Sequence, residues 1–344
     1  MLDKKSKKVD ITTVSKVAKV SPSTVSRYFN HPDLLKTTTR KSIDSAIRKT
    51  GYIRNRAAQT IHGIRSGTIG VIVPTLDHAI FAEVVQAFSE TVEAHGFTIL
   101  LASHGYDLQR EYAILRKLLE HRVDGIVLTG LKHEEAVFQL LDRQGIPCAL
   151  MWNYSDTSRI PSIGADNEQA GRLVAQHVLS LGHKSIACMF PPTGDNDRAH
   201  GRITGVLDAL QEADINVPTE WMLETPYSIA DAKNDARQLF LKETRPTALI
   251  CGNDVLAAGA LFAATATGLS VPNDITVAGI GDFQGSSEIE PSLTTVRLPA
   301  RQIGEETANA LAAAIVSFNT ELINSMNCVP KLITRGSSAA PRSG

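Results

Sequence analysis

The hydrophobic pattern of the first fifty residues predicts three short helices. Apolar residues recur at helical spacing over 11–18, directly after Asp10, which stands where a helix N-cap is expected. A second helix should begin at Pro22, because Ser21 is a good N-cap and proline fits the first helical position. A third should span about 38–50, where isoleucine and alanine recur on one face. We expect these helices to form a small head.

The rest of the chain alternates short apolar runs with amphipathic stretches. The apolar runs, each bounded by Gly, Pro or polar residues, span 69–73, 98–102, 125–129, 148–151, 186–190, 248–251 and 276–280. Amphipathic stretches such as 81–95 and 111–121 lie between most of them, so the sheets should be parallel. This body of roughly 280 residues exceeds one usual domain. We therefore predict an α/β fold in which a helical head precedes a two-lobed body.

The first two helices of the head are joined by a very short turn at Lys19 and Val20. Helices joined in this way form a helix-turn-helix, whose second helix lies in the major groove of DNA with its first residues at the base edges. In that arrangement Pro22, Ser23 and Arg27 would face the DNA. An ordinary helical hairpin gives the same local pattern, so the pattern alone does not decide between the two.

The distribution of charge favours DNA binding. Residues 1–66 carry 15 Lys and Arg against 4 Asp and Glu, a net charge of +11, whereas the remainder carries 20 against 32, a net charge of −12. A strongly basic head on an acidic body is typical of a module that binds phosphates. The lysines of segment 4–8 should add only nonspecific attraction.

Segment 52–63, which follows the head, is weakly helical and has little apolar surface. Isolated helices of this length are marginal in water, so we expect the segment to order only against DNA or a partner chain. Its order would then act as a switch.

The head, this segment and the start of the body together resemble one family. The three small helices, the Tyr-Ile-x-Asn-Arg-x-Ala pattern at 52–58 and the apolar run 69–74 are similar to the LacI/GalR family of bacterial repressors. The resemblance spans nearly the whole chain. It implies a helix-turn-helix DNA-binding domain over 1–54, a hinge helix over 55–66, and an effector-binding and dimerisation domain over 67–344.

The resemblance implies roles for residues of the head and hinge. Arg27 would contact guanine, which a guanidinium can pair with through O6 and N7, and Pro22 and Ser23 would occupy the two specificity positions. The paired hinge helices would enter the minor groove, with Ile61 in place of the family's intercalating leucine. The expected DNA-binding residues are Ser21, Pro22, Ser23, Thr24, Arg27, Asn30, Tyr52, Asn55, Arg56, Ala58 and Ile61.

Two further residues depart from the family's pattern. Lys19 stands where the family usually has Gly in the turn, so we expect modest strain from a left-handed backbone. Arg54 stands where the family usually has Pro, so we expect a looser start of the hinge and an added phosphate contact.

For the body, the resemblance implies a fold like that of periplasmic binding proteins, with a cleft between the lobes and chain crossings near residues 165, 292 and 325. Ligands in such open sheets lie at the carboxyl ends of strands, where loops converge. Four residue groups lie at those ends. The expected effector-binding residues are Asp77, His78, Ile80, Phe81, Trp152, Asn153, Arg198, Arg202, Asn253, Asp254 and Asp282.

Several of these residues have structural alternatives. Ile80 and Phe81 could equally belong to the core. Trp152 could be buried in its lobe instead of stacking on a sugar ring. Arg198 could form a surface salt bridge, and Asp254 could cap a helix that begins at Val255. Arg202 is the strongest candidate, since it aligns with the family's effector-binding arginine and offers a fixed fork of donors.

Two features favour an acidic effector. Many sugar-binding relatives have Asp-Asp at 281 and 282, whereas this chain has Gly281 and Asp282, which lowers repulsion toward an anion. Within the family, the gluconate-utilisation repressors are the branch that resembles segments 81–84, 94–97 and 104–106. We therefore expect gluconate or a related sugar acid, with Arg202 and Arg198 neutralising its carboxylate; a sugar or sugar phosphate is the alternative.

The sequence gives little support to an enzyme or a metalloprotein. No P-loop or G-x-S-x-G occurs, the glycines of 279–285 lack the G-x-G-x-x-G spacing, and the ten histidines show no metal-ligand spacing. We expect no cofactor. The four cysteines are scattered, at 148, 188, 251 and 328, which is typical of reduced thiols in a cytosolic protein.

The sequence shows no export signal and no apolar run long enough to cross a membrane, so we expect a cytoplasmic protein. A periplasmic-type solute-binding protein without DNA function is the alternative, and it would need such a signal. The tail 335–344 lacks apolar heptads, so we expect a homodimer and not a tetramer. The sequence thus predicts a repressor that binds a pseudo-palindromic, double-stranded operator as a dimer and responds to a small effector.

Overall fold

The computed structural model describes residues 9–54, 65–77 and 79–342, and the chain divides into two units, Met1–Ser66 and Gly67–Gly344. The first unit contains α1 (Ile11–Ala18), α2 (Pro22–Asn30), the short 3-10 helix η1 (Pro32–Leu34) and α3 (Thr37–Thr50). Both predicted N-caps are confirmed: Asp10 accepts a hydrogen bond from the Thr13 N–H, and Ser21 accepts one from the Thr24 N–H.

A small apolar core holds the three helices of this unit together. Its fully buried members are Val14 of α1, Val25 of α2 and Ile43 of α3. Lys19, at the C-terminal end of α1, adopts the expected left-handed conformation with φ 56°. Such a conformation costs a lysine roughly 1–2 kcal/mol, and the sharp turn that it makes brings α2 across α1.

The first lobe of the second unit is a parallel sheet in the order β11-β5-β4-β3-β1-β2. Its described elements are β1 (Thr68–Val73), α5 (Ala79–Ala94), β2 (Thr98–Ser103), α6 (Leu108–Glu120), β3 (Gly125–Thr129), α7 (Glu135–Gln144), β4 (Cys148–Asn153), β5 (Ser162–Ala165), α12 (Ala300–Ser317), η3 (Thr320–Leu322) and β11 (Met326–Asn327).

The second lobe is a sheet in the order β12-β10-β9-β8-β6-β7, parallel except for the antiparallel pairing of β10 with β12. Its described elements are α8 (Asn167–Ser180), β6 (Ile186–Phe190), α9 (Asp197–Glu212), η2 (Thr219–Trp221), β7 (Met222–Glu224), α10 (Ile229–Phe240), β8 (Ala248–Cys251), α11 (Asp254–Thr267), β9 (Thr276–Gly281), β10 (Thr294–Arg297) and β12 (Lys331–Ile333).

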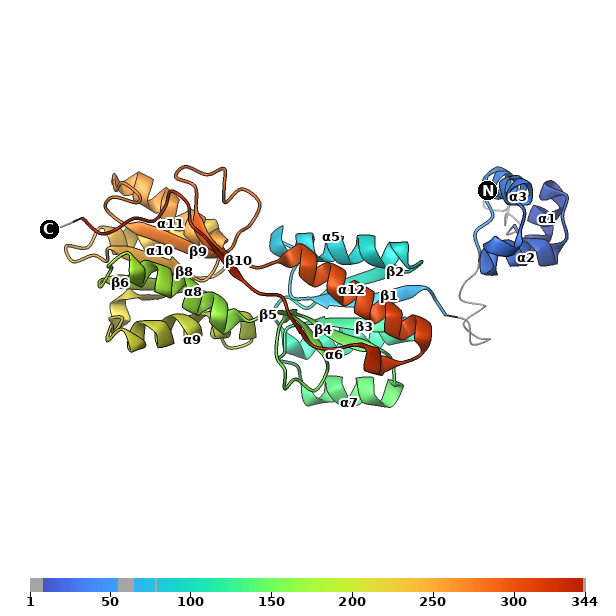
Figure 1. Ribbon diagram of the computed structural model, residues 1–344, viewed down its shortest axis with the longest axis horizontal. Helices are drawn as coiled ribbons and strands as arrows, with labels where there is room; N and C mark the ends of the chain where they lie inside the picture. The colour runs from blue at the N-terminus through green and yellow to red at the C-terminus, as the bar shows by residue number, and fades with distance from the viewer. Residues whose placement is uncertain (1–8, 55–64, 78, 343–344) are drawn as a thin grey trace, which may run out of the picture. The chain divides into compact units, whose positions relative to one another are not determined.

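Helices cover both faces of each sheet, as the continuous apolar strands predict (Figure 1). Successive residues of β1 face opposite sides: Val71 packs in the core beneath α5 and α12, and Ile72 in the core beneath α6 and α7. In the second lobe, α8 and α9 cover one face and α10 and α11 the other. Because helices cover the faces of the sheets, a ligand site is expected at the carboxyl ends of the strands, here those of β1, β3, β6 and β8.

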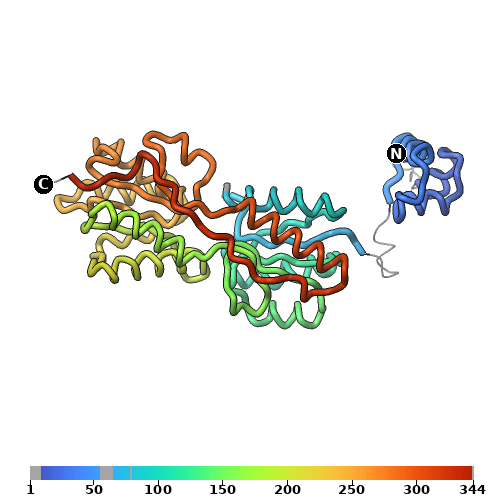
Figure 2. The backbone as a smooth tube through the Cα atoms, in the orientation of Figure 1, coloured from blue at the N-terminus to red at the C-terminus, as the bar shows by residue number. Residues whose placement is uncertain are grey.

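The described chain passes between the two lobes at three places (Figure 2). The first passage follows Ala165 and agrees with the expected position near 165. The second was expected near 292, but residues 294–297 still form β10 of the second sheet, so the chain crosses between Arg297 and Ala300. The third was expected near 325, but Met326 and Asn327 pair with β5 of the first sheet, so the crossing lies at 328–330.

No helix among the described residues is long and apolar enough to cross a membrane.

Candidate functional site

The start of α2 presents exposed polar groups, as a DNA-reading helix requires. Pro22, Ser23 and Arg27 are exposed, whereas Val25 of the same helix is buried in the head core. The hydroxyl of Ser21 lies 2.8 Å from the hydroxyls of both Ser23 and Thr24. Small hydroxyl donors and one guanidinium at a helix N-terminus are groups that can contact base edges in the major groove.

Residues 55–64 of the hinge, whose start Arg54 was expected to loosen, lie outside the described part of the chain, but Arg54 itself packs against α2. Its guanidinium lies over the Phe29 ring, 5.1 Å from the centroid, and donates a hydrogen bond to the side-chain oxygen of Asn30. The Tyr52 ring packs 6.1 Å from the Phe29 ring. These contacts hold Arg54 and Tyr52 against α2, and the bond from Arg54 engages the side-chain oxygen of Asn30, a residue expected to bind DNA. Other expected residues lie outside the described part of the chain: Asn55, Arg56, Ala58, Ile61 and His78.

A buried arginine marks the second site, in the second lobe. Helices α8 and α9 approach closely there, because a Cβ at Gly205 would lie only 1.9 Å from the Glu168 carbonyl oxygen. The approach places Asn167 beside Arg202. Arg202 Nε donates to Asn167 Oδ1 at 2.8 Å, and its Nη1 donates to the Gly252 carbonyl oxygen at 2.9 Å. Arg202 is 5% exposed, and both of these acceptors are neutral.

Arg198 lies one helical turn before Arg202 on α9 and is also buried. Its Nη1 lies 2.8 Å from Asp197 Oδ1, and its guanidinium lies 5.9 Å from the centroid of the Tyr106 ring. The alternative of a surface salt bridge is therefore half right: Arg198 does form an ion pair, but with only 6% of its side chain exposed.

Asp197 connects the two lobes. Its Oδ2 accepts hydrogen bonds from the backbone N–H groups of Leu131 at 2.6 Å and Lys132 at 3.3 Å, and from Asn153 Nδ2 at 3.0 Å. These donors follow β3 and end β4 in the first lobe, whereas Asp197 begins α9 in the second. Asn153 also accepts a bond from Asn167 Nδ2 at 3.2 Å, which links this connection to Arg202.

Aromatic side chains from both lobes surround the two arginines. They enclose an inner cavity of about 20 Å³, which is lined by Ile80, Phe81, Tyr106, Trp152, Arg198, Arg202, Tyr227, Asn253 and Phe283. An outer cavity of about 600 Å³ shares Tyr106 and Tyr227 with it, and these two rings lie 6.1 Å apart. Asp77 lines this outer cavity. The inner cavity holds no more than a water molecule, so a sugar could enter only if the aromatic rings separate.

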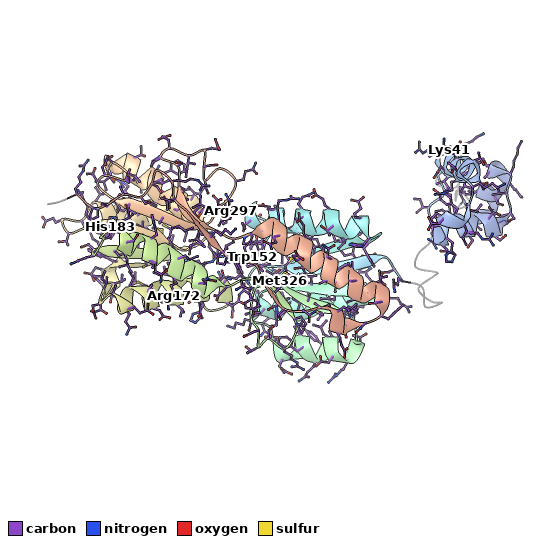
Figure 3. All side chains as sticks on the ribbon, in the orientation of Figure 1. Lys41, Trp152, Arg172, His183, Arg297 and Met326 are labelled. Carbon is purple, nitrogen blue, oxygen red and sulfur yellow. The ribbon has the colours of Figure 1, made fainter. Side chains whose placement is uncertain are left out.

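Trp152 is largely a packing residue. It is 1% exposed, lies where the two lobes meet (Figure 3) and packs its ring 5.5 Å from that of Phe81. Its backbone has φ 91°, a region that tryptophan rarely adopts. Trp152 is therefore buried in its lobe, and it also forms part of the cavity wall.

Asp254 supports the loop that closes the cavity. Its buried carboxylate accepts hydrogen bonds from the Phe283 N–H at 3.0 Å, the Ser286 hydroxyl at 2.7 Å and the Thr295 hydroxyl at 2.6 Å. Burial raises its pKa. The expectation that Asp254 caps a helix is wrong: α11 begins at Asp254, and Asn253 is the N-cap.

The structure places the Asp282 carboxylate away from this cavity. It forms ion pairs at 2.6 Å with both Arg297 and Arg335, and its side chain is 6% exposed. Both arginines come from later in the chain, so the sequence around Asp282 does not predict these ion pairs. Asp282 therefore joins β9, β10 and the C-terminal segment.

Burial determines the titration of the groups around the cavity. It lowers the pKa of Arg202, and the neighbouring Arg198 charge acts in the same direction. Burial raises the pKa of Tyr106 far above its ordinary range, which keeps its hydroxyl protonated. A negatively charged group placed between the arginines would relieve the cost of their burial.

The sequence alone did not indicate four members of this site as effector contacts: Tyr106, Asn167, Asp197 and Tyr227. Asn167 and Asp197 each stand at a helix start, a position where polar residues most often act as caps. The close packing of α8 on α9 brings Asn167 to Arg202, and the contact between the lobes brings first-lobe donors to Asp197, which directly precedes Arg198 in the chain. No group of three or more His, Cys, Asp or Glu among the described residues could hold a metal ion.

Two sequence models of protein families match the chain. One, described as "Periplasmic binding proteins and sugar binding domain of LacI family", matches residues 66–333. The other, described as "Bacterial regulatory proteins, lacI family", matches residues 10–55.

Individual relatives match over most of their length. The HTH-type transcriptional repressor PurR of Salmonella paratyphi B is 30% identical over 332 residues, which are 96% of each chain. Among solved structures, the transcription regulator GntR of Chromobacterium violaceum is 30% identical with a TM-score of 0.73, covering 79% of this chain and 99% of that one. The lac repressor dimer bound to operator and the anti-inducer ONPF is 26% identical with a TM-score of 0.84, covering 97% and 100%.

Proposed function

The chain belongs to the LacI family of bacterial regulatory proteins, and we propose that it represses genes of sugar-acid catabolism under the control of an anionic effector such as gluconate. It is a DNA-binding transcriptional repressor with a sugar-binding domain, and its family consists of regulators and not enzymes.

The environment of Arg202 supports an anionic effector. A buried charge is costly unless an opposite charge accompanies it, and the two hydrogen-bond acceptors of Arg202 are neutral. The carboxylate of a sugar acid would supply that charge and could pair with the guanidinium. Hydroxyl groups of the same ligand could bond to Asn253 or to the protonated Tyr106.

The two cavities also support a ligand of this kind. Tyr106 and Tyr227 come from different lobes and line both cavities. Their rings offer apolar faces to a carbon chain and hydroxyls to its polar groups. An effector that separates them changes the contact between the lobes, and we infer that this change reaches the DNA-binding head through the start of β1.

We infer that the head binds operator DNA through the start of α2, two heads per dimer and one half-site for each. The basic charge of residues 1–66 provides the phosphate attraction. Such a regulator acts in the cytoplasm, where the operator is.

The proposal is tested in two steps with the full-length protein. Selection from random duplexes should first yield a pseudo-palindromic operator. Calorimetric titration should then show binding of gluconate, and little binding of glucose or of a neutral purine base. Preferential binding of a neutral ligand would overturn the anionic effector while leaving the regulator intact.

A further inference from the structure

The two arginines of the cavity differ in how their charge is compensated. Arg198 forms an ion pair with Asp197 at 2.8 Å, whereas the acceptors of Arg202 are an amide oxygen and a backbone carbonyl oxygen. Both arginines are 5% exposed, so solvent screens neither of them well. The charge of Arg198 is therefore neutralised by the Asp197 carboxylate, whereas the charge of Arg202 has no carboxylate among these hydrogen-bond partners.

Asp197 is held firmly in this position. Its Oδ1 faces Arg198, and its Oδ2 accepts the N–H groups of Leu131 and Lys132 and the amide of Asn153. Four donors thus surround one carboxylate, three of them from the other lobe. Such a set of donors is what a protein builds to bind a ligand carboxylate, and here a side chain of the protein fills it.

Other carboxylates act less directly on the two arginines. The charge of Asp254 raises the pKa of Arg202, but its influence is smaller than that of the Arg198 charge, which lowers it. The Asp254 carboxylate is directed to the Phe283 N–H and two hydroxyls. Asp77 and Asp195 line the outer cavity; Asp195 pairs with Lys132 at 2.9 Å, and the Asp77 carboxylate would repel a second negative charge placed there.

We propose that Asp197 determines the charge class of the effector: by neutralising Arg198 it leaves Arg202 as the cation for the ligand, so the site accepts a singly charged sugar acid and discriminates against doubly charged ones. This inference rests on the proposed anionic effector and goes beyond it. It assigns phosphorylated sugar acids and sugar diacids to the rejected class.

Gluconate and glucarate provide a matched pair of probes, because they share a six-carbon polyhydroxy chain and differ in carrying one or two carboxylates. Calorimetric titration of the wild-type protein should give about tenfold or more tighter binding of gluconate than of glucarate or 6-phosphogluconate. In Asp197→Asn, which keeps an oxygen for the Leu131 N–H but loses the charge, the ratio should shift toward the dianions by about tenfold, which is about 1.4 kcal/mol.

Two further variants identify charge as the cause. The double variant Asp197→Asn with Arg198→Gln removes both charges of the pair, and it should restore the preference for gluconate. Asp208→Asn removes a half-exposed carboxylate of the same helix that pairs with Arg172, and it should leave the ratio unchanged. Thermal melting and operator binding of each variant report on its fold.

The outcomes separate the two levels of the proposal. If the wild-type protein binds none of the three anions, the proposed effector class fails. If it binds gluconate but prefers or equally accepts the dianions, or if a folded Asp197→Asn variant keeps the wild-type ratio, the role of Asp197 is overturned. If that variant does not fold, the ratio of gluconate affinity to dianion affinity in the wild-type protein still shows whether the site discriminates against dianions.

Discussion

Asn167 of α8 accepts a 2.8 Å hydrogen bond from Nε of Arg202 on α9. The bond exists because two helices meet through glycines: a Cβ at Gly171 would lie 2.0 Å from the Arg202 carbonyl oxygen. Asn167 also donates to Asn153 of the first lobe. The orientation of the buried arginine is thereby linked to both lobes of the protein.

Arg202→Ala should abolish the response to effector while leaving operator affinity intact. The loss of charge-assisted hydrogen bonds should weaken effector binding by about 1.5–3 kcal/mol. Calorimetry with gluconate and a DNA-binding assay measure the two effects separately. The control Arg172→Ala removes a partly exposed arginine of α8 that pairs with Glu212, and it should change neither. A normal effector response in Arg202→Ala would show that the site is elsewhere.

Arg27→Ala should reduce discrimination between operator and unrelated DNA by roughly 1–3 kcal/mol, because an exposed guanidinium on α2 would no longer contact a base. Fluorescence anisotropy with both DNAs gives the ratio. Effector binding should be unchanged.

The matched control for Arg27 is Lys49→Ala, which removes one exposed positive charge from the last turn of α3. It should affect operator and unrelated DNA to the same extent. Equal losses on both DNAs in Arg27→Ala would mean that Arg27 contacts only phosphates.

His183 should make stability depend on pH. It is 2% exposed and bonded at 2.8 Å to the Thr247 hydroxyl and to the Ala339 carbonyl oxygen, at the far end of the second lobe (Figure 3). Burial lowers its pKa below the ordinary 6.5. Below pH 6.5 the unfolded chain therefore binds a proton that the folded chain does not, so stability is lost as pH falls through that range.

Thermal melting between pH 5.5 and 7.5 measures this dependence. Burial lowers the pKa of His104 and His177 as well, so all three histidines contribute with the same sign. His183→Gln should make the fall in melting temperature below pH 6.5 shallower, whereas His121→Gln, at an exposed position, should not. An unchanged slope in the first variant would exclude His183 as a contributor.

Binding of two DNA-binding heads to the two half-sites of one operator should require a dimer. Ser337 is buried, donates to the Val277 carbonyl oxygen at 2.6 Å and accepts from the Thr294 N–H at 2.8 Å, so the C-terminal segment is bound to its own lobe. Residues 334–342 form no helix that could join a bundle. Multi-angle light scattering should give twice the mass of the 37.1 kDa chain. A stable tetramer at micromolar concentration would contradict this expectation.

Strands with an unbroken apolar run could be predicted closely from the sequence. The runs 125–129 and 186–190 coincide with β3 and β6, because strands covered on both faces are apolar throughout. The strand β10 was missed because its buried positions include Thr294 and Thr295. The Thr295 hydroxyl donates to Asp254, the Thr294 N–H donates to Ser337 and the Thr294 hydroxyl bonds to Ser338. These partners, which make the burial of the polar atoms possible, lie about forty residues away in the chain.

Residues of the candidate cavity could be predicted only where a single residue could be placed by its local position or by its resemblance to the family's pattern. Arg198 and Arg202 were identified in that way and do meet in the cavity. Asn167 and Arg202 lie 35 residues apart, and their contact depends on how closely two helices pack. The ion pairs of Asp282 could not be predicted from the sequence of its loop either, because both partner arginines are distant in the chain.

Control of operator binding by the effector is tested most directly by measuring operator affinity with and without gluconate, and gluconate affinity with and without operator, on the same protein. Thermodynamic linkage requires the two ratios to be equal if one site controls the other. We predict that gluconate binds and changes operator affinity by at least fivefold, the lower end of typical coupling, with the same factor in the reverse experiment. Operator affinity that stays constant at saturating gluconate would show that gluconate does not control this repressor.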